Sequence, residues 1–387
     1  MGDSQKLTPD EQIALCRDQF DAGTDFTLAV EEEFALLDPE TLTMVNRFEE
    51  IVERAQGSAL EPHLAGELIA SEAEVKTGRC ETFADAARLL PERRRQLLEI
   101  TDALGMEIAA VGTHPWSHWK DQRIIDTPHY RRNDEILKYV VWRNNTFGLH
   151  VHVGIKGVDR AIWVCNALRN HLPTLLALSS SSTFVEGVYT HLHSARSQVF
   201  TKMFPRCGIP DAFADWADFE NYVRFLYRTN SIDEHTQLWW SVRPHLAYPT
   251  VEIRICDAQP SAEEAVALSA LIHALTARLA RAIDEGEPIV HQPHRLLEEN
   301  FWRAIRHGLD GELLNLEKGT VVSARQAVED LVEYVLPVAE EIGTAPFISI
   351  PERNSAQRQQ ADHAAGASME EIYREIVRAV RPAPARV

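Results

Sequence analysis

The chain has 387 residues, 45% of them hydrophobic, and is therefore long enough to bury a sizeable core. Its 58 acidic residues outnumber 39 lysines and arginines, a formal charge of −19 that disfavours non-specific binding to nucleic acid or anionic membranes. We find no basic leader and no apolar run long enough to cross a bilayer, so we expect a cytoplasmic protein without a nucleic-acid or membrane role.

The cysteines are odd in number, widely spaced and never in a CxxC pair. They are Cys16, Cys80, Cys165, Cys207 and Cys256. This pattern indicates neither a disulfide framework nor a zinc knuckle, and we expect reduced, mostly buried thiols.

The first predicted strand covers residues 25–37 and contains three consecutive glutamates in an otherwise apolar stretch. Alternate side chains of a strand share a face, so Glu31 and Glu33 point one way and Glu32 the other. "DPET" at 38–41 has turn chemistry, and "LTMV" after it predicts a hairpin. A buried carboxylate needs a cationic partner or a proton, so the glutamates need an explanation.

The next segment, 67–77, mixes carboxylates with small and apolar residues and ends at Gly78. Glu72 and Glu74 in it form another i, i+2 pair. A long helix is predicted from Thr82 as N-cap, kinked or split at Pro91, and "MEIAAVGTHPW" predicts a strand that runs into a loop.

Two later strands, 145–155 and 248–257, repeat the plan of the first. His150 and His152 share a face of one, and Glu252 and Arg254 share a face of the other, with aliphatic residues behind them. Helical patterns cover roughly 159–185, 216–228, 261–284, 322–342 and 368–380, and the least regular stretches are 284–294 and 343–368.

Strands that carry carboxylates occur near the N-terminus and again past residue 250, which favours one sheet over separate domains. We therefore predict one α+β catalytic domain over residues 25–380, with a largely antiparallel sheet and helices gathered on one face. It would be preceded by an N-terminal extension, 1–24, and followed by a C-terminal tail, 381–387.

Each of these side-chain pairs also has a simpler interpretation. The glutamates could be a solvated sheet face, the histidines a hydrogen-bonded structural pair, and Glu252 with Arg254 an ion pair. Their joint occurrence instead predicts bound divalent cations. Carboxylate oxygens suit Mg²⁺ or Mn²⁺, and two metals beside an arginine would suit a nucleoside triphosphate.

Several motifs resemble, in order, the type 2 glutamate–cysteine ligase family, also called YbdK-like carboxylate-amine ligases. The resemblance runs from about residue 25 to about residue 375 and rests on "FTLAVEEEF", "SEAEVKTG", "GTHPW", "FGLHVHVGI", "SARSQVFTKMFPRCGIP", "VEIRICD" and "NFWRAIRHGLDG". It implies a glutamine synthetase-like fold, in which a curved antiparallel sheet forms a funnel for ATP and two or three divalent metals. It also implies that ATP phosphorylates a carboxylate, by default the γ-carboxylate of glutamate, and that an amine, by default cysteine, then displaces phosphate.

The resemblance also assigns roles to residues. The implied metal ligands are Glu31, Glu33, Glu74, His150 and Glu252. Arg254 would face the transferred phosphoryl group, and we assign it to catalysis together with Arg196. Arg196 and Arg206 could hold the carboxylate of the acid substrate or merely pack their loop. His152 is expected to contact substrate or nucleotide rather than metal, and we group it with Arg206 and with Arg358 of "NSAQRQQ" as cofactor-binding.

The chain departs from the family pattern around the first motif. Ala29 replaces the usual glycine, and Glu32 stands where an apolar residue is usual, so Glu32 must meet solvent, pair with a cation or turn inward at a bulge. Glu67 and Glu72 match no family ligand, and solvated acids on an edge strand are one interpretation of them.

The leading prediction is thus an ATP-dependent ligase with Mg²⁺, or Mn²⁺ in its place, that acts on small molecules and, by family resemblance, forms a homodimer. Two alternatives stay open. One is a metal-dependent amide hydrolase that uses His150, His152 and the glutamates, and the other is a nucleotide or metabolite sensor without catalysis.

Overall fold

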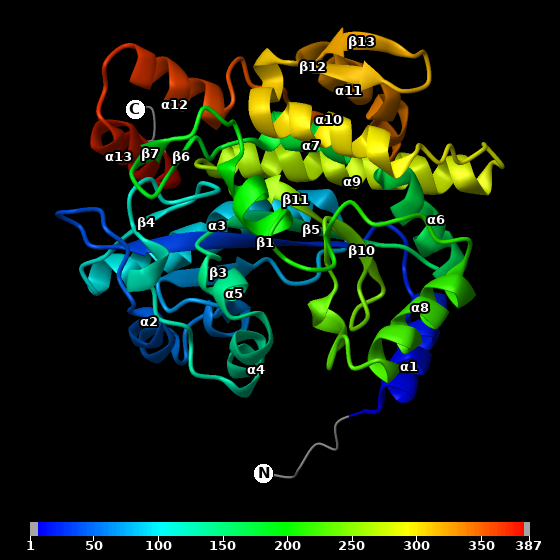
Figure 1. The fold of residues 1–387 in the computed structure, drawn as a ribbon, viewed down its shortest axis with the longest axis horizontal. Coiled ribbons are helices and arrows are strands. Elements are labelled where there is room, and N and C mark those ends of the chain that lie inside the picture. Colours follow the sequence, from blue (N-terminus) through cyan, green and yellow to red (C-terminus); the bar gives the residue numbers. More distant parts are fainter. Residues whose placement is uncertain (1–6, 383–387) are drawn as a thin grey trace.

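A seven-stranded sheet with helices on both sides forms the centre of the computed structural model, which describes residues 7–382 (Figure 1). The strand order is β10-β11-β5-β1-β3-β2, β4 also pairs with β1, and every pairing in this sheet is antiparallel. The strands are β1 (Leu28–Leu37), β2 (Leu64–Ala65), β3 (Glu72–Lys76), β4 (Glu107–Ala109), β5 (Gly148–Gly154), β10 (Val242–Pro244) and β11 (Thr250–Asp257).

Helices account for most of the remaining regular structure. They are α1 (Pro9–Asp21), α2 (Phe48–Ala55), α3 (Phe83–Ala103), α4 (Pro128–Leu137), α5 (Tyr139–Trp142), α6 (Val158–Leu168), α7 (Leu172–Ser179), α8 (Trp216–Arg228), α9 (Ala262–Asp284), α10 (His294–His307), α11 (Ala324–Glu341), α12 (Ser355–Ala364) and α13 (Met369–Val380). Three two-stranded pairs are β6 (Phe184–Val185) with β7 (Val188–Tyr189), β8 (Cys207–Gly208) with β9 (Trp239–Trp240), and β12 (Glu312–Asn315) with β13 (Thr320–Ser323).

The larger core lies between the sheet and a layer of helices that includes α6, α7, α9, α10 and α11 (Figure 1). Leu149, Val151 and Val153 of β5 are fully buried in it. Because side chains alternate along a strand, this packing leaves the polar residues of β5 on the opposite face. The α+β fold with a largely antiparallel sheet is confirmed. The prediction that the helices gather on one face is wrong, because α4 and α5 lie over the polar face (Figure 1).

Helix α9 has the length and composition of a membrane span, although the sequence showed us no such run. In the structure 78% of its apolar window is buried within the protein, so α9 is a core helix.

Two helix predictions differ from the structure: the break expected at Pro91 is absent, and a break that was not expected occurs before Pro173. Helix α3 continues through Pro91 to Ala103, since Leu90, Arg94 and Leu97 anchor both halves in the interior. The predicted helix 159–185 is instead two helices, and Pro173 lies in the first turn of the second, where a missing N–H costs no helical bond.

Two other segments differ from prediction. "LTMV" contributes only an isolated bridge between Met44 and Leu37, so residues 38–45 form no regular hairpin. The irregular stretch 343–368 contains α12, which begins with a capping box between Asn354 and Gln357. Helix α10 had not been predicted.

The two predicted flanking segments contact the fold where they are described. In the extension, α1 buries Ile13, Cys16 and Phe20 in the main core. In the tail, Arg381 forms ion pairs with Asp102 and Glu107, and residues 383–387, like residues 1–6, lie outside the described part.

Candidate active site

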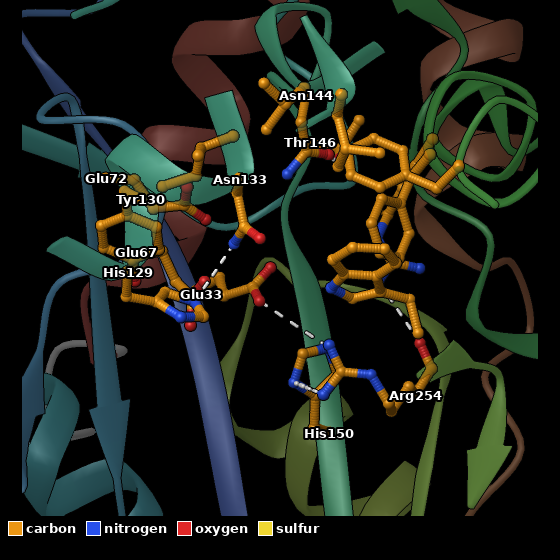
Figure 2. Close-up of a pocket in the computed structure, with 17 residues that line it drawn as sticks. Glu33, Glu67, Glu72, His129, Tyr130, Asn133, Asn144, Thr146, His150 and Arg254 are labelled. Atoms are coloured by element: carbon orange, nitrogen blue, oxygen red, sulfur yellow. Dashed lines mark hydrogen bonds and ion pairs between the residues drawn. The ribbon is translucent and has the colours of Figure 1, made fainter. Parts of the chain in front are cut away.

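The pocket on the polar face of the sheet collects side chains from β1, β3, β5, β11, α4 and the short π-helix Ser197–Thr201 with its flanking residues (Figure 2). Strand register brings polar residues of this face together: Glu31 lies opposite His150, Glu33 opposite Glu74, and Glu252 opposite His152. Of these six, Glu33 and His150 line the pocket. Residues far apart in the sequence therefore become neighbours on one surface.

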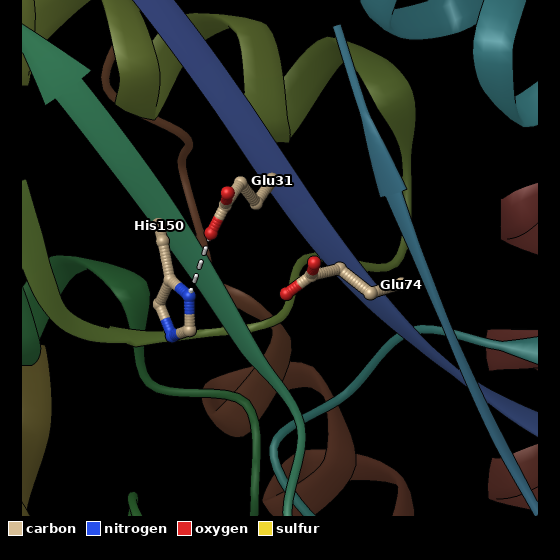
Figure 3. A group of neighbouring side chains, drawn as sticks. All are labelled: Glu31, Glu74 and His150. Atoms are coloured by element: carbon tan, nitrogen blue, oxygen red, sulfur yellow. Dashed lines mark ion pairs between the residues drawn. The ribbon is translucent and has the colours of Figure 1, made fainter. Parts of the chain in front are cut away.

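Glu31, Glu74 and His150 form the first group of potential metal ligands, with ligand atoms all within 4.8 Å of one another (Figure 3). Nδ1 of His150 lies 3.6 Å from Glu31, and its Nε2 lies 3.7 Å from Glu33. These separations exceed hydrogen-bond length, so an ion could lie between the imidazole and these carboxylates.

A second group consists of Glu31, His152 and Glu252. The His152 Nε2 lies 3.5 Å from Glu31 and 3.7 Å from Glu252, and it is buried with no hydrogen-bond partner among residues 7–382. Its other nitrogen lies 3.0 Å from the Thr250 hydroxyl, which fixes the ring. A buried ring nitrogen aimed between two carboxylates fits a bound cation.

A third group joins Glu33 and Glu74 with Glu67, and Glu72 lines the same pocket. Glu72 is 2% exposed, so the solvated-edge interpretation is wrong for it. Burial, followed by repulsion from neighbouring carboxylates, raises the pKa of Glu72 and Glu74 well above the usual range, and raises that of Glu67 too. A divalent cation would remove that repulsion, so the donor set fits one.

Cations of the protein balance part of this charge. Lys76 Nζ lies 3.1 Å from Glu31 and 2.6 Å from Glu74. Arg243 and Arg254 both pair with Glu252; although burial acts in the opposite direction, the two arginines hold the pKa of Glu252 well below its usual range. Glu252 is thus ionised at neutral pH, and Arg254 is fixed beside it in the pocket.

Glu32 points away from the pocket and is 4% exposed. The Arg94 guanidinium contacts both of its carboxylate oxygens, at 2.9 and 2.5 Å, and also donates to the carbonyls of Gln259 and Pro260. The register of β1 is regular here, so no bulge turns Glu32 inward. Of the interpretations left open, pairing with a cation is confirmed.

The predicted arginines divide into two sets. Arg196 and Arg254 line the pocket, and Arg196 is 2% exposed. Arg206 and Arg358 do not line it. The Arg206 guanidinium stacks over the Trp239 ring and donates to the Gln237 carbonyl, and Arg358 pairs with Glu264.

Sequence reasoning missed the pocket wall formed by α4 and nearby segments. Tyr130 and Asn133 lie on α4, and Phe200, Phe204 and Trp239 supply aromatic surface. Figure 2 shows Tyr130 and Asn133 across the pocket from His150 and Arg254. A signal for α4 existed, because Thr127 followed by Pro128 is a typical helix start.

Known proteins resemble this chain over most of its length. The sequence model of glutamate-cysteine ligase family 2 matches residues 27–379. A Solibacter usitatus protein named "Putative glutamate--cysteine ligase 2" is 39% identical over 339 residues, 86% of this chain and 88% of its own. A Rubrobacter xylanophilus protein named "Putative glutamate--cysteine ligase 2-3" is 40% identical over 325 residues, 84% and 87% of the two chains.

Two solved structures share the fold. The glutamate–cysteine ligase of Francisella tularensis, in complex with AMP, superimposes with a TM-score of 0.66 at 12% identity and covers 94% of this chain and 91% of its own. A bifunctional glutathione synthetase from Pasteurella multocida gives 0.62 at 14% identity, with 96% of this chain and 53% of its own covered.

Proposed function

The chain belongs to glutamate-cysteine ligase family 2 and is thus an ATP-dependent ligase that joins a carboxylate to an amine; we propose that the acid is glutamate, reacting at its γ-carboxylate, and that the amine is cysteine. The observation that supports this chemistry is that Glu31 belongs to two ligand groups at once, with Arg254 beside the second.

A carboxylate is a poor electrophile at neutral pH, so it must be activated before an amine can attack it. A carboxylate oxygen attacks the γ-phosphorus of ATP, ADP leaves, and a mixed acyl phosphate forms. The amine nitrogen then attacks the carbonyl carbon, the C–O bond to phosphate breaks, and the nitrogen loses a proton to give the amide. Negative charge builds on phosphate oxygens in both steps, where fixed positive charge lowers the barrier.

Glu31, Glu33, Glu74, His150 and Glu252 would hold Mg²⁺, or Mn²⁺ in its place. Such ions, when bound, offset the charge of the nucleotide phosphates. His152 stands where it could complete the group with Glu31 and Glu252, and its predicted contact with substrate or nucleotide stays a prediction.

Arg254 carries a planar guanidinium whose Nη1 pairs with Glu252 and whose Nε has no hydrogen-bond partner among the described residues. Although burial opposes protonation, Glu252 raises the pKa of Arg254, so the charge is permanent. We assign Arg254 to the transferred phosphoryl group and Arg196 to the carboxylate of the acid substrate.

The state of the cysteines supports a proposal for the cellular compartment. All five cysteines are unpaired, which a reducing compartment favours, so we place the protein in the cytoplasm. A homodimer is the assembly that we propose from the family resemblance.

The test is ADP release from purified protein with ATP, Mg²⁺, glutamate and a panel of amines that includes cysteine. We expect ADP only when acid and amine are both present, and the amide in equal amount. Amide cleavage without ATP would favour the hydrolase alternative, and tight ATP binding without turnover would favour the sensor.

A further inference from the structure

Asp257, the last residue of β11, is fully buried and has no role in the chemistry described above. It follows a register shift between Ile253 and Cys256. The Ser181 amide and the Ser182 hydroxyl donate to its Oδ2 at 3.0 and 2.7 Å, and the Ser194 hydroxyl donates to its Oδ1 at 2.9 Å. The Asp257 carboxylate therefore links the end of β11 to the segments that contain Ser181, Ser182 and Ser194.

One of these serines, Ser182, also contacts Arg196. The Arg196 amide donates to the Ser182 Oγ at 3.1 Å, and its Nη1 lies 3.9 Å from the nearer oxygen of Asp257. Its guanidinium donates to the carbonyls of Ile255 and Arg254 at 3.2 and 3.3 Å. The Arg196 Nε, although buried, has no hydrogen-bond partner in the part of the chain that the structure describes. The two carbonyls thus hold the guanidinium of Arg196, which lines the pocket, and its Nε–H has no partner of its own within residues 7–382.

Little space surrounds this arrangement. A Cβ added at Gly112 would lie 2.7 Å from the Asp257 carboxyl carbon, and one added at Gly148 would clash with the Arg196 guanidinium. The backbone at Gly112 thus packs directly on Asp257, and the backbone at Gly148 packs directly on Arg196. This close packing leaves the Arg196 guanidinium little room to move.

The motif "NSAQRQQ", residues 354–360, contacts the segment 177–183 that contains Ser181 and Ser182. The Gln359 amide donates to the Ser181 carbonyl at 2.6 Å and accepts from the Thr183 hydroxyl at 2.8 Å. Asn354 donates to the carbonyls of Ala177 and Leu178 at 3.0 and 3.1 Å. The start of α12 therefore fixes the bend 177–183 that presents the serines to Asp257.

We propose that Asp257 is a positioning residue for Arg196, and that Gln359 of α12 locks the serine bend through which Asp257 acts. The role given to Arg196 rests on the proposed function, whereas its placement by Asp257 does not. The motif "NSAQRQQ" would thus act on the site through Gln359, which supports the placement of Arg196. Arg358 of the same motif does not line the pocket.

The first measurement is independent of activity. Crystal structures of the wild type and of Asp257→Asn are compared, with Ser194→Ala as the second variant if Asp257→Asn does not fold. In each variant we expect the Arg196 guanidinium to move out of hydrogen-bond range of the Ile255 carbonyl, the Arg254 carbonyl or both, while β5 and β11 keep their register. An Arg196 that stays in place in both variants would overturn the proposal.

The second measurement is steady-state kinetics with the acid–amine pair that the wild type uses. Asp257→Asn and Gln359→Ala should raise KM for the acid by about tenfold or more and change KM for ATP far less. Asp284→Asn, on the surface at the end of α9, and Gln360→Ala, next to Gln359, are the matched controls and should leave both constants unchanged.

A double-variant cycle separates positioning from general damage. In an Arg196→Met background, Asp257→Asn should cause no further rise in the KM of the acid, because its effect passes through the arginine. Full additivity would overturn the proposal. A wild type that releases no ADP with any acid and amine would refute the proposed function instead, and the crystallographic comparison would still decide the role of Asp257.

Discussion

Glu74 belongs to two of the ligand groups, one with Glu31 and His150 and the other with Glu33 and Glu67. Burial, together with Glu31 and Glu67, raises its pKa well above the usual range, so its ionised form is costly unless a cation is bound. A single side chain therefore links the stability of the protein to metal binding.

Replacing Glu74 by Gln should abolish most of the stabilisation that Mg²⁺ gives. For the wild type, Mg²⁺ at about 100 times its Kd should raise the free energy of unfolding by about 2.7 kcal/mol. Urea denaturation with Mg²⁺ and with EDTA measures this difference. Glu81→Gln, an exposed acid five residues past Lys76, is the control and should respond to Mg²⁺ like the wild type. An equal Mg²⁺ response in Glu74→Gln would contradict the ligand assignment.

Arg94 and Glu32 act on the other face of the same strand. The pair is 2% and 6% exposed at its side chains and ties α3 to β1 and to the loop after β11. Removing one partner leaves a buried charge alone, whereas removing both leaves none.

Arg94→Met should therefore lower the free energy of unfolding by about 3–5 kcal/mol, and the double variant Arg94→Met/Glu32→Leu should recover much of that loss. Arg95→Met, one residue on and facing solvent, should have little effect. Equal stability of Arg94→Met and the wild type in chemical denaturation would show that Glu32 does not need the arginine.

The direction of side chains on the strands could be predicted from the sequence, because side chains alternate between the two faces of a strand. The shared face of Glu31 and Glu33, that of His150 and His152, and the opposite direction of Glu32 follow from the period of a strand alone. The period of a strand does not predict that Arg94 pairs with Glu32, or that Glu67 and Glu72 join the pocket. Both outcomes depend on segments that only the tertiary fold brings together.

Helix α3 is the element in which local propensity and tertiary packing disagree most. Pro91 is exposed in the middle of a continuous helix. It removes one backbone hydrogen bond there, and the buried side chains on either side hold the helix together in spite of it. At Pro173 the reverse happened: the helix predicted over 159–185 is divided, and Pro173 lies in the first turn of α7.

Pro91→Ala should stabilise the protein by about 1–2 kcal/mol, because a restored helical bond outweighs the greater freedom of the unfolded chain. Thermal unfolding measures the change, and Arg88→Ala on the same helix serves as a control for a neutral surface substitution. A lower melting temperature in Pro91→Ala would show instead that α3 requires a bend at this position.

At the scale of the whole molecule, the sheet brings the first strand, the middle strand and the strand past residue 250 side by side as β1, β5 and β11. The single sheet could be predicted, since strands with the same polar plan occur along the whole chain. The pocket wall from α4 and α5 was missed, because the helix start at Thr127 and Pro128 does not show which surface the helix packs on, and α5 has only four residues. The support of Arg196 by α12 was equally invisible, as its contacts span more than 170 positions in the chain.

Phosphorylation of the acid leaves a trace in the products. The acid is supplied with ¹⁸O in the reacting carboxylate, and the inorganic phosphate formed with the amide is analysed by mass spectrometry. One ¹⁸O atom should appear in each phosphate, since the attacking carboxylate oxygen leaves with the phosphoryl group. Amide formation with unlabelled phosphate would contradict the account.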